Sequence, residues 1–167
     1  MKPQKSESDM ARAALAAAYN RFRRDATTPN VSAWYASLGE TLWWIVALDD
    51  HYRTRYKSAY ARLRDCDKDG YVIPGLLLAR NQVGHALARM LEDPGSPSTV
   101  LPSAGLTLNQ LVWRRLEDLP PVKKTKVSDF QEAIYEAHLA TEPHRFALRH
   151  ASGFFVRRRP TLDSALR

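Results

Sequence analysis

One apolar stripe constrains the fold of this chain more than any other feature of its sequence. Over residues 32–64, apolar or aromatic residues recur in alternating steps of four and three, the spacing that places side chains on one face of an α-helix. The positions on the stripe are Leu38, Leu42, Ile45, Asp49, Tyr52, Tyr56, Ala59 and Leu63. Around Trp43 and Trp44 the segment is apolar on nearly every side. The pattern therefore predicts a long helix at the centre of a bundle, with both indoles in the core.

Shorter helical patterns surround this segment. We expect helices over residues 6–25, 76–91 and 128–140, and a fifth after Pro143. Ser6 or Ser8 is expected to cap the first helix, and Ser128 with Gln131 forms a capping box for the fourth. Together these segments predict an all-α fold, an up-and-down bundle of four to five helices.

The region between the third and fourth helices has a different composition. Prolines and glycines between residues 93 and 127 predict an irregular crossing, in which residues 111–114 fit either a short strand or a packed loop. At 167 residues the chain is long enough for one domain. We expect that domain to span residues 1–167, with flexible ends at 1–6 and 158–167.

Net charge, cysteine content and apolar runs indicate which partners, which cysteine-based sites and which cellular location to expect. The net charge of +7 and the pI near 9.8 favour acidic partners, with nucleic acid first and anionic membrane second. The single cysteine, Cys66, excludes an internal disulfide and a cysteine-based zinc site. The longest apolar run, residues 42–48, is too short to span a membrane, and the polar N-terminus lacks a signal-peptide pattern. These features predict a cytoplasmic protein without a membrane segment.

Two charged residues fall on faces where apolar residues are expected. Asp49 lies on the stripe of the second helix, and Arg80 lies on the seam of the third, which runs through Ile73, Leu77 and Gly84. A buried carboxylate or guanidinium needs an opposite charge or several hydrogen bonds. We therefore predict that Asp49 and Arg80 face each other across this helix pair. This pair could support a functional site, or it could be only a structural ion pair that fixes the register of the two helices.

Arg80 opens a short motif that also contains Asn81 and His85. On a helix, His85 would lie about 140° around the axis from Arg80 and about 7.5 Å along it, whereas Asn81 and His85 share a face. One helix cannot bring all three groups to a point. A site that uses them together is either wide or completed by a second copy of the same helix.

This motif resembles the signature of the HEPN-domain ribonucleases, which consists of an Arg, a polar residue, a short spacer and a His on one helix. The setting is similar too, with a long helix, a short polar turn and then the motif helix. Arg145 and His150 show the same Arg-to-His spacing, but the residue after Arg145 is Phe146 rather than a polar residue. We therefore expect Arg145 and His150 to lie at the surface or the core edge.

The resemblance implies a HEPN-like bundle and an endoribonuclease that works as a homodimer without metal or cofactor. His85 would act as general base or acid, Arg80 would hold the phosphate, Asn81 would orient His85 or bind a phosphate oxygen, and Asp49 would support Arg80. The products would carry 2′,3′-cyclic phosphate ends, and the biological role would be that of a toxin or an antiviral defence effector, with an antitoxin or regulatory protein as a further partner. The alternative is a catalytically inactive helical module that binds RNA, a nucleotide or a protein through the same cleft.

The turn between the second and third helices carries a partial calcium-loop pattern. Asp65, Asp67 and Asp69 occupy its first ligand positions and Gly70 follows, but Leu76 stands where the bidentate glutamate is needed. The pattern therefore favours a polar turn, with Gly70 supplying a positive φ, over a calcium site.

Overall fold

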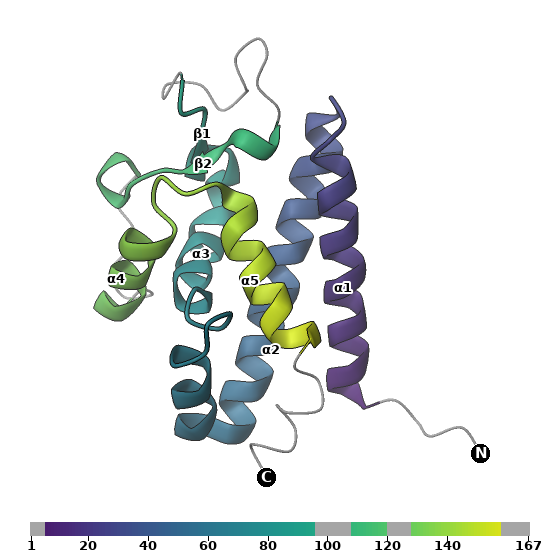
Figure 1. Ribbon diagram of the computed structural model, residues 1–167, viewed down its shortest axis with the longest axis vertical. Helices are drawn as coiled ribbons and strands as arrows, with labels where there is room; N and C mark the ends of the chain where they lie inside the picture. The colour runs from purple at the N-terminus through teal and green to yellow at the C-terminus, as the bar shows by residue number, and fades with distance from the viewer. Residues whose placement is uncertain (1–5, 96–107, 120–127, 158–167) are drawn as a thin grey trace, which may run out of the picture.

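The computed structural model describes residues 6–95, 108–119 and 128–157, with the backbone alone for residues 82–89, 109 and 157. Five helices dominate these ranges (Figure 1): α1 (Glu7–Asp25), α2 (Val31–Asp65), α3 (Ile73–Met90), α4 (Asp129–His138) and α5 (His144–Arg157). The other elements are the strands β1 (Leu91–Glu92) and β2 (Val112–Trp113) and the 3₁₀ turns η1 (Leu108–Gln110) and η2 (Leu116–Asp118). The prediction of an all-α bundle is confirmed.

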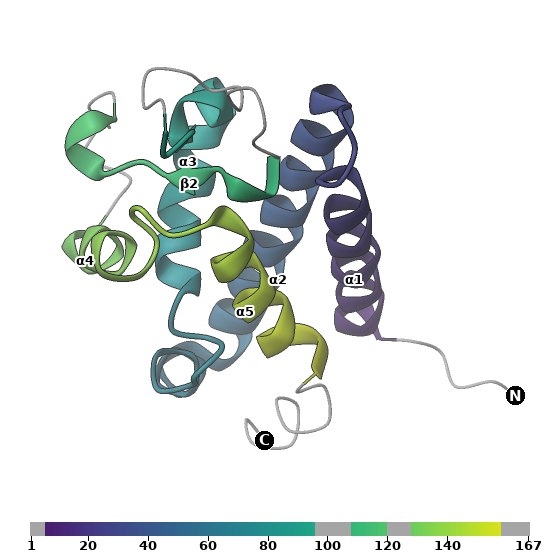
Figure 2. The same ribbon diagram turned by 45° about the horizontal axis from the view of Figure 1, so that its top comes forward.

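The long helix α2 lies at the centre of the bundle. In both views α1 runs alongside α2, α5 crosses the same pair, and α3 lies between α2 and the short α4 (Figures 1 and 2). The stripe of α2 is buried from Leu38 through Leu42 and Ile45 to Tyr52. No helix within the described ranges is long and apolar enough to cross a membrane.

Local capping signals set the helix starts. The Ser6 side chain accepts a hydrogen bond from the Asp9 amide at 3.2 Å, and the Ser128 side chain accepts one from the Gln131 amide at 3.3 Å. Both are capping boxes: the one at Ser128 is as predicted, and at the first helix the cap is Ser6 rather than the alternative Ser8. Helix α3 begins at Ile73, before the position expected, because Pro74 is tolerated in a first turn where its missing N–H has no helical partner.

Helix α2 is interrupted at Lys57, and the interruption changes which side chains are buried. Lys57 has φ 48° and ψ −124°, so its backbone is not helical. Beyond it the buried residues are Tyr60 and Arg64, each one position later than the Ala59 and Leu63 that the unbroken stripe predicts. The four-three prediction is therefore correct up to Tyr52 and wrong beyond Lys57.

Buried aromatic rings join the second half of α2 to α5. The Tyr52 ring stacks on Tyr60 at 5.5 Å between centroids and on Phe155 at 6.1 Å. Phe154 packs against Tyr60 at 6.2 Å. Because these side chains are all fully buried, they fix α5 against α2 on both sides of the interruption.

The sequence did not decide between a short strand and a packed loop for residues 111–114, and the structure has the short strand β2 there. Strand β2 pairs antiparallel with β1, with Leu91 opposite Trp113, and Trp113 is fully buried. The Tyr135 hydroxyl of α4 donates a hydrogen bond to the Arg114 carbonyl at 2.7 Å. The crossing is thus attached both to the end of α3 and to α4. The rest of the Pro-rich segment, 96–107 and 120–127, and the expected flexible end 158–167 lie outside the described residues.

Two glycines allow close packing around α3. A Cβ at Gly75 would lie 3.1 Å from the Tyr135 Cα and 2.9 Å from Leu139 Cδ1, so a larger residue would press on the backbone of α4. A Cβ at Gly70 would lie 2.6 Å from the Arg64 carbonyl oxygen and 3.0 Å from the Phe154 ring. The expected positive φ at Gly70 is not observed, and close backbone approach is the reason that a glycine is needed there.

Candidate functional site

The motif helix borders an open hollow of about 470 Å³ between α2, α3 and the start of α4, which we name the α2–α3 hollow. Its lining residues are Trp43, Val46, Ala47, Asp49, Asp50, Arg53, Leu77, Arg80, Asn81 and Gln131. Three of the four predicted site residues, Arg80, Asn81 and Asp49, therefore border one space. The fourth, His85, lies in the part of α3 where only the backbone is described.

Arg80 lies at the rim of this hollow rather than on a buried seam. The buried positions in this part of α3 are Leu76, Leu78 and Ala79, whereas Leu77 and Arg80 are half-buried. The predicted seam at Leu77 and Arg80 therefore borders the hollow, and Leu77 also packs against the edge of the core. Asn81, the next residue, is exposed.

Asp49 is buried as predicted, but its cation is not Arg80. The Asp49 carboxylate accepts hydrogen bonds at 2.9 Å from Arg64 Nη1 and at 2.9 Å from the Tyr60 hydroxyl. The predicted Asp49–Arg80 pair is thus wrong. The prediction failed because α2 is interrupted at Lys57. Beyond this residue, Tyr60 and Arg64 occupy the buried positions of the helix.

The electrostatics around Asp49 are those of a compact buried network. Burial and the nearby negative charge of Asp49 raise the pKa of Tyr60 well above its usual value, so this hydroxyl stays a donor. Burial alone would lower the pKa of Arg64, but its hydrogen bonds and ion pairs with Asp65 and Asp49 outweigh burial and raise it. Asp49 therefore stabilises the second half of α2, and it has no direct role in holding Arg80.

Among the residues that the structure describes, this arrangement leaves Arg80 without a carboxylate partner. Asp50, the other acid in the hollow, pairs with Arg53 at 2.7 Å. Within the described ranges no ion pair joins Arg80 to an acidic side chain. A guanidinium in a hollow of this kind is suited to binding an anion such as a phosphate group.

Trp43 also lines the hollow and is 48% exposed, so the prediction that it lies in the core is wrong. Trp44 is half-buried and packs edge-to-face on Trp43, with ring centroids 4.5 Å apart. The apolar residues around this pair could not show which indole would be covered. The hollow therefore has an exposed indole and a guanidinium in its walls, which provide a stacking surface and a positive charge.

The acidic turn after α2 is a structural turn. Asp67 Oδ1 accepts hydrogen bonds from the Asp69 amide at 2.8 Å and the Gly70 amide at 3.2 Å. Asp69 Oδ1 lies 2.9 Å from His150 Nδ1, and Asp65 pairs with Arg64. In the ranges that the structure describes, no group of three or more His, Cys, Asp or Glu side chains is placed to hold a metal ion.

The second Arg-to-His match lies at the molecular edge, as expected. Arg145 is exposed, and His150 is half-buried against Asp69. No pattern in the sequence singled out the neighbouring His144, which is fully buried and packs edge-to-face against the rings of Phe22 and Trp34. Burial lowers the pKa of His144 to about 4, although the hydrogen bond with the Leu111 carbonyl acts in the opposite direction and raises it. The ring is therefore neutral at pH 7.

Comparisons of the chain with protein-family models, with curated proteins and with solved structures found no match.

Proposed function

We propose that the chain is a HEPN-type endoribonuclease that cleaves RNA without a metal ion, at a site built around the motif Arg80, Asn81 and His85. The proposal rests on the likeness of the motif and on one observation of the structure. That observation is that the buried carboxylate beside Arg80 is bound to Arg64 and Tyr60, which leaves the Arg80 guanidinium in an open hollow with no acidic partner among the described residues. An arginine that served only as scaffolding would be expected to have such a partner.

In the proposed reaction the 2′-hydroxyl of a ribose attacks the adjacent phosphorus. A new bond forms between that oxygen and phosphorus, the bond to the 5′-oxygen breaks, and the products are a 2′,3′-cyclic phosphate and a 5′-hydroxyl. The imidazole of His85 takes up or delivers a proton, for which its ordinary pKa near neutrality is suited. Arg80 stabilises the negative charge that develops on the phosphate oxygens.

A second copy of the chain would complete the site. One helix places Arg80 and His85 about 140° apart, so a single motif cannot surround one phosphate. The exposed Trp43 and Asn81 lie at the hollow, where a partner helix or an RNA base would cover them. We further propose that the dimer acts in the cytoplasm as a toxin or antiviral effector under the control of an antitoxin or regulatory protein.

Binding without cleavage is the second candidate function, and the exposure of Trp43 favours it. A half-exposed indole and a guanidinium that line the same hollow can stack a base and hold a phosphate without any chemistry. This reading predicts RNA binding that weakens steeply with salt and yields no cyclic-phosphate ends.

The test is incubation of the purified chain with mixed single-stranded RNA in EDTA, followed by analysis of the RNA ends. We expect His85→Ala and Arg80→Ala each to reduce cleavage at least about a hundredfold, the range typical of a lost acid–base group or charge-stabilising donor. Arg62→Ala is the matched control, because Arg62 is an exposed arginine of α2 outside the hollow.

Circular dichroism and size-exclusion chromatography of each variant separate loss of chemistry from loss of fold or dimer. Cleavage that is unchanged in a folded His85→Ala variant would remove the ribonuclease assignment. Salt-sensitive binding with no cleavage by the unmodified chain would establish the binding module instead.

A further inference from the structure

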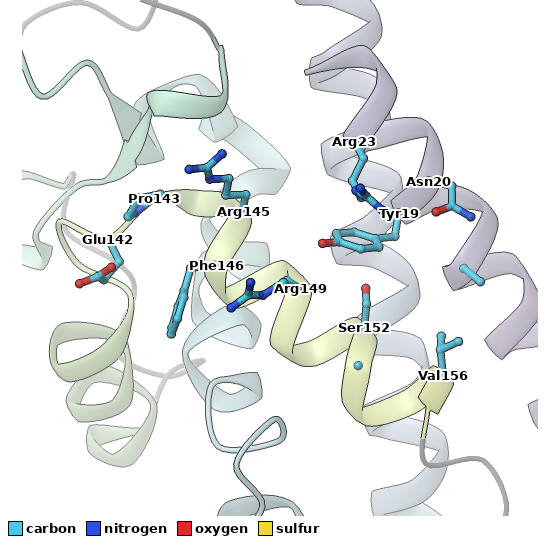
Figure 3. A pocket seen from close by; sticks show the side chains of 12 residues that line it. Tyr19, Asn20, Arg23, Glu142, Pro143, Arg145, Phe146, Arg149, Ser152 and Val156 are labelled. Atoms are coloured by element: carbon cyan, nitrogen blue, oxygen red, sulfur yellow. The ribbon is translucent and has the colours of Figure 1, made fainter. Parts of the chain in front are cut away.

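A second and larger hollow lies between α1 and α5, and it shares no lining residue with the α2–α3 hollow. Its volume is about 710 Å³, within the range of pockets that hold small organic ligands. We name it the α1–α5 hollow. Its lining includes Tyr19 and Arg23 of α1 and Arg145, Arg149 and Ser152 of α5, which Figure 3 labels.

The α1–α5 hollow carries an excess of positive charge. Arg23, Arg145 and Arg149 all line it, and across the described part of the chain no ion pair joins any of the three to a carboxylate. Glu142 is the one acidic residue in the lining, so the formal charge of the walls is 3 − 1 = +2. Phe146 lies 6.0 Å from the Arg149 guanidinium, in a cation–π contact that holds the charge at the wall.

A buried hydroxyl in the same wall has no partner. Ser152 is 5% exposed, and its Oγ makes no hydrogen bond to any part of the chain that the structure describes. In Figure 3 the Ser152 hydroxyl points from α5 toward Tyr19, into the hollow. A buried hydroxyl without a partner carries a free-energy cost that a ligand oxygen would remove.

The remaining walls are largely apolar. Tyr19, Phe146, Pro143 and Val156 contribute aromatic and aliphatic surface. A hollow of about 710 Å³ is also far larger than one phosphate group, so the head group of an anion would fill only part of it.

We propose that the α1–α5 hollow binds a small organic phosphate monoester whose body is an apolar or aromatic ring. The phosphate carries a charge of about −1.5 to −2 near neutral pH, which matches the +2 of the walls better than the single charge of a carboxylate does. Arginine forks bind phosphate through paired hydrogen bonds, and Ser152 supplies a further donor. The ring lies against Tyr19 and the apolar wall of α5.

The test uses isothermal titration calorimetry on the full chain with 1-naphthyl phosphate as the probe. Inorganic phosphate represents the head alone and 1-naphthol the body alone. We expect 1-naphthyl phosphate to bind at least about tenfold more tightly than either, because each supplies only half of the contacts. AMP and a 5′-phosphorylated oligonucleotide distinguish a free nucleotide from an RNA end as the natural source of such a group.

Arg149→Ala and Arg145→Ala should each weaken binding of 1-naphthyl phosphate by at least about tenfold, the usual loss for a hydrogen bond to a charged group. Arg62→Ala should leave it unchanged, and both hollow variants should keep their circular dichroism spectrum because the replaced side chains are exposed. Equal affinity for inorganic phosphate and 1-naphthyl phosphate, tight binding of 1-naphthol, or affinity that survives both substitutions would each overturn the proposal. The result is independent of RNA cleavage, which is tested with Arg80 and His85.

Discussion

The buried carboxylate of Asp49 offers a direct test of which arginine it needs. Asp49 is 1% exposed, and its charge is balanced by Arg64, whose side chain is 8% exposed, with one further hydrogen bond from Tyr60. Arg64→Met would leave the carboxylate buried with Tyr60 alone, which we expect to cost about 3–5 kcal/mol. In a chain of this size that corresponds to a fall in Tm of roughly 6–20 °C. Arg80→Met should change stability by less than about 0.5 kcal/mol, since Arg80 is half-buried and has no acidic partner among the described residues.

A double-mutant cycle isolates the pairwise energies. Urea unfolding followed by circular dichroism is measured for Asp49→Asn, for Arg64→Met and Arg80→Met, and for the two double variants. We expect a coupling energy of about 2–3 kcal/mol between Asp49 and Arg64, because Arg64→Met leaves no buried charge once Asp49 is neutral. The coupling between Asp49 and Arg80 should be below about 0.5 kcal/mol. The reverse order of the two couplings would refute the network described here and return Arg80 to a structural role.

Two further predictions concern the backbone and pH. Lys57→Gly should stabilise the chain by about 1 kcal/mol in urea unfolding, because glycine adopts φ 48° without strain. The control Ser58→Gly changes the adjoining helical residue and should destabilise the chain by about 0.5–1 kcal/mol. Equal losses of stability in both variants would contradict backbone strain at Lys57. The folded-state pKa of His144 is about 4 and its ordinary value is 6.5, so its contribution to stability is complete above pH 6.5 and is lost as the pH falls toward 4. Between pH 7 and pH 4 the unmodified chain should therefore lose about 3 kcal/mol more than His144→Gln does, and parallel pH profiles would show that His144 is not buried in its neutral form.

Features that depend on a few neighbouring residues could be predicted from the sequence. The capping box at Ser128 is complete within four residues, so that helix start could be predicted, whereas the sequence left Ser6 and Ser8 as alternative caps of the first helix. The apolar stripe of α2 was also correct as far as Tyr52, because helical periodicity holds wherever the backbone stays helical.

Features that depend on tertiary contacts or on a single backbone angle could not be predicted. Nothing in the residues around Lys57 signals a positive φ, yet this one angle brings Arg64 rather than Leu63 to a buried position and gives Asp49 its partner. The exposure of Trp43 depends equally on which neighbours α3 and α4 provide. The motif at Arg80 was found from its pattern of residue types, whereas the α1–α5 hollow combines α1 with α5 and has no contiguous signature.

A net charge of +7 is compatible with a role in solubility alone. The positions of four arginines argue that these four have another role. Arg80 lines one hollow, and Arg23, Arg145 and Arg149 line another, in each case without a carboxylate partner in the described part of the chain. If charge served only solubility, replacing Arg62, Arg80 or Arg149 would weaken the binding of every anion by the same small amount, since each removes one surface cation. The two proposed sites predict selectivity instead: replacing Arg80 should affect binding of RNA and not of a small aryl phosphate, replacing Arg149 should do the opposite, and replacing Arg62 should affect neither. A uniform basic surface would not produce that crossed pattern, so binding assays with the three variants distinguish the two explanations.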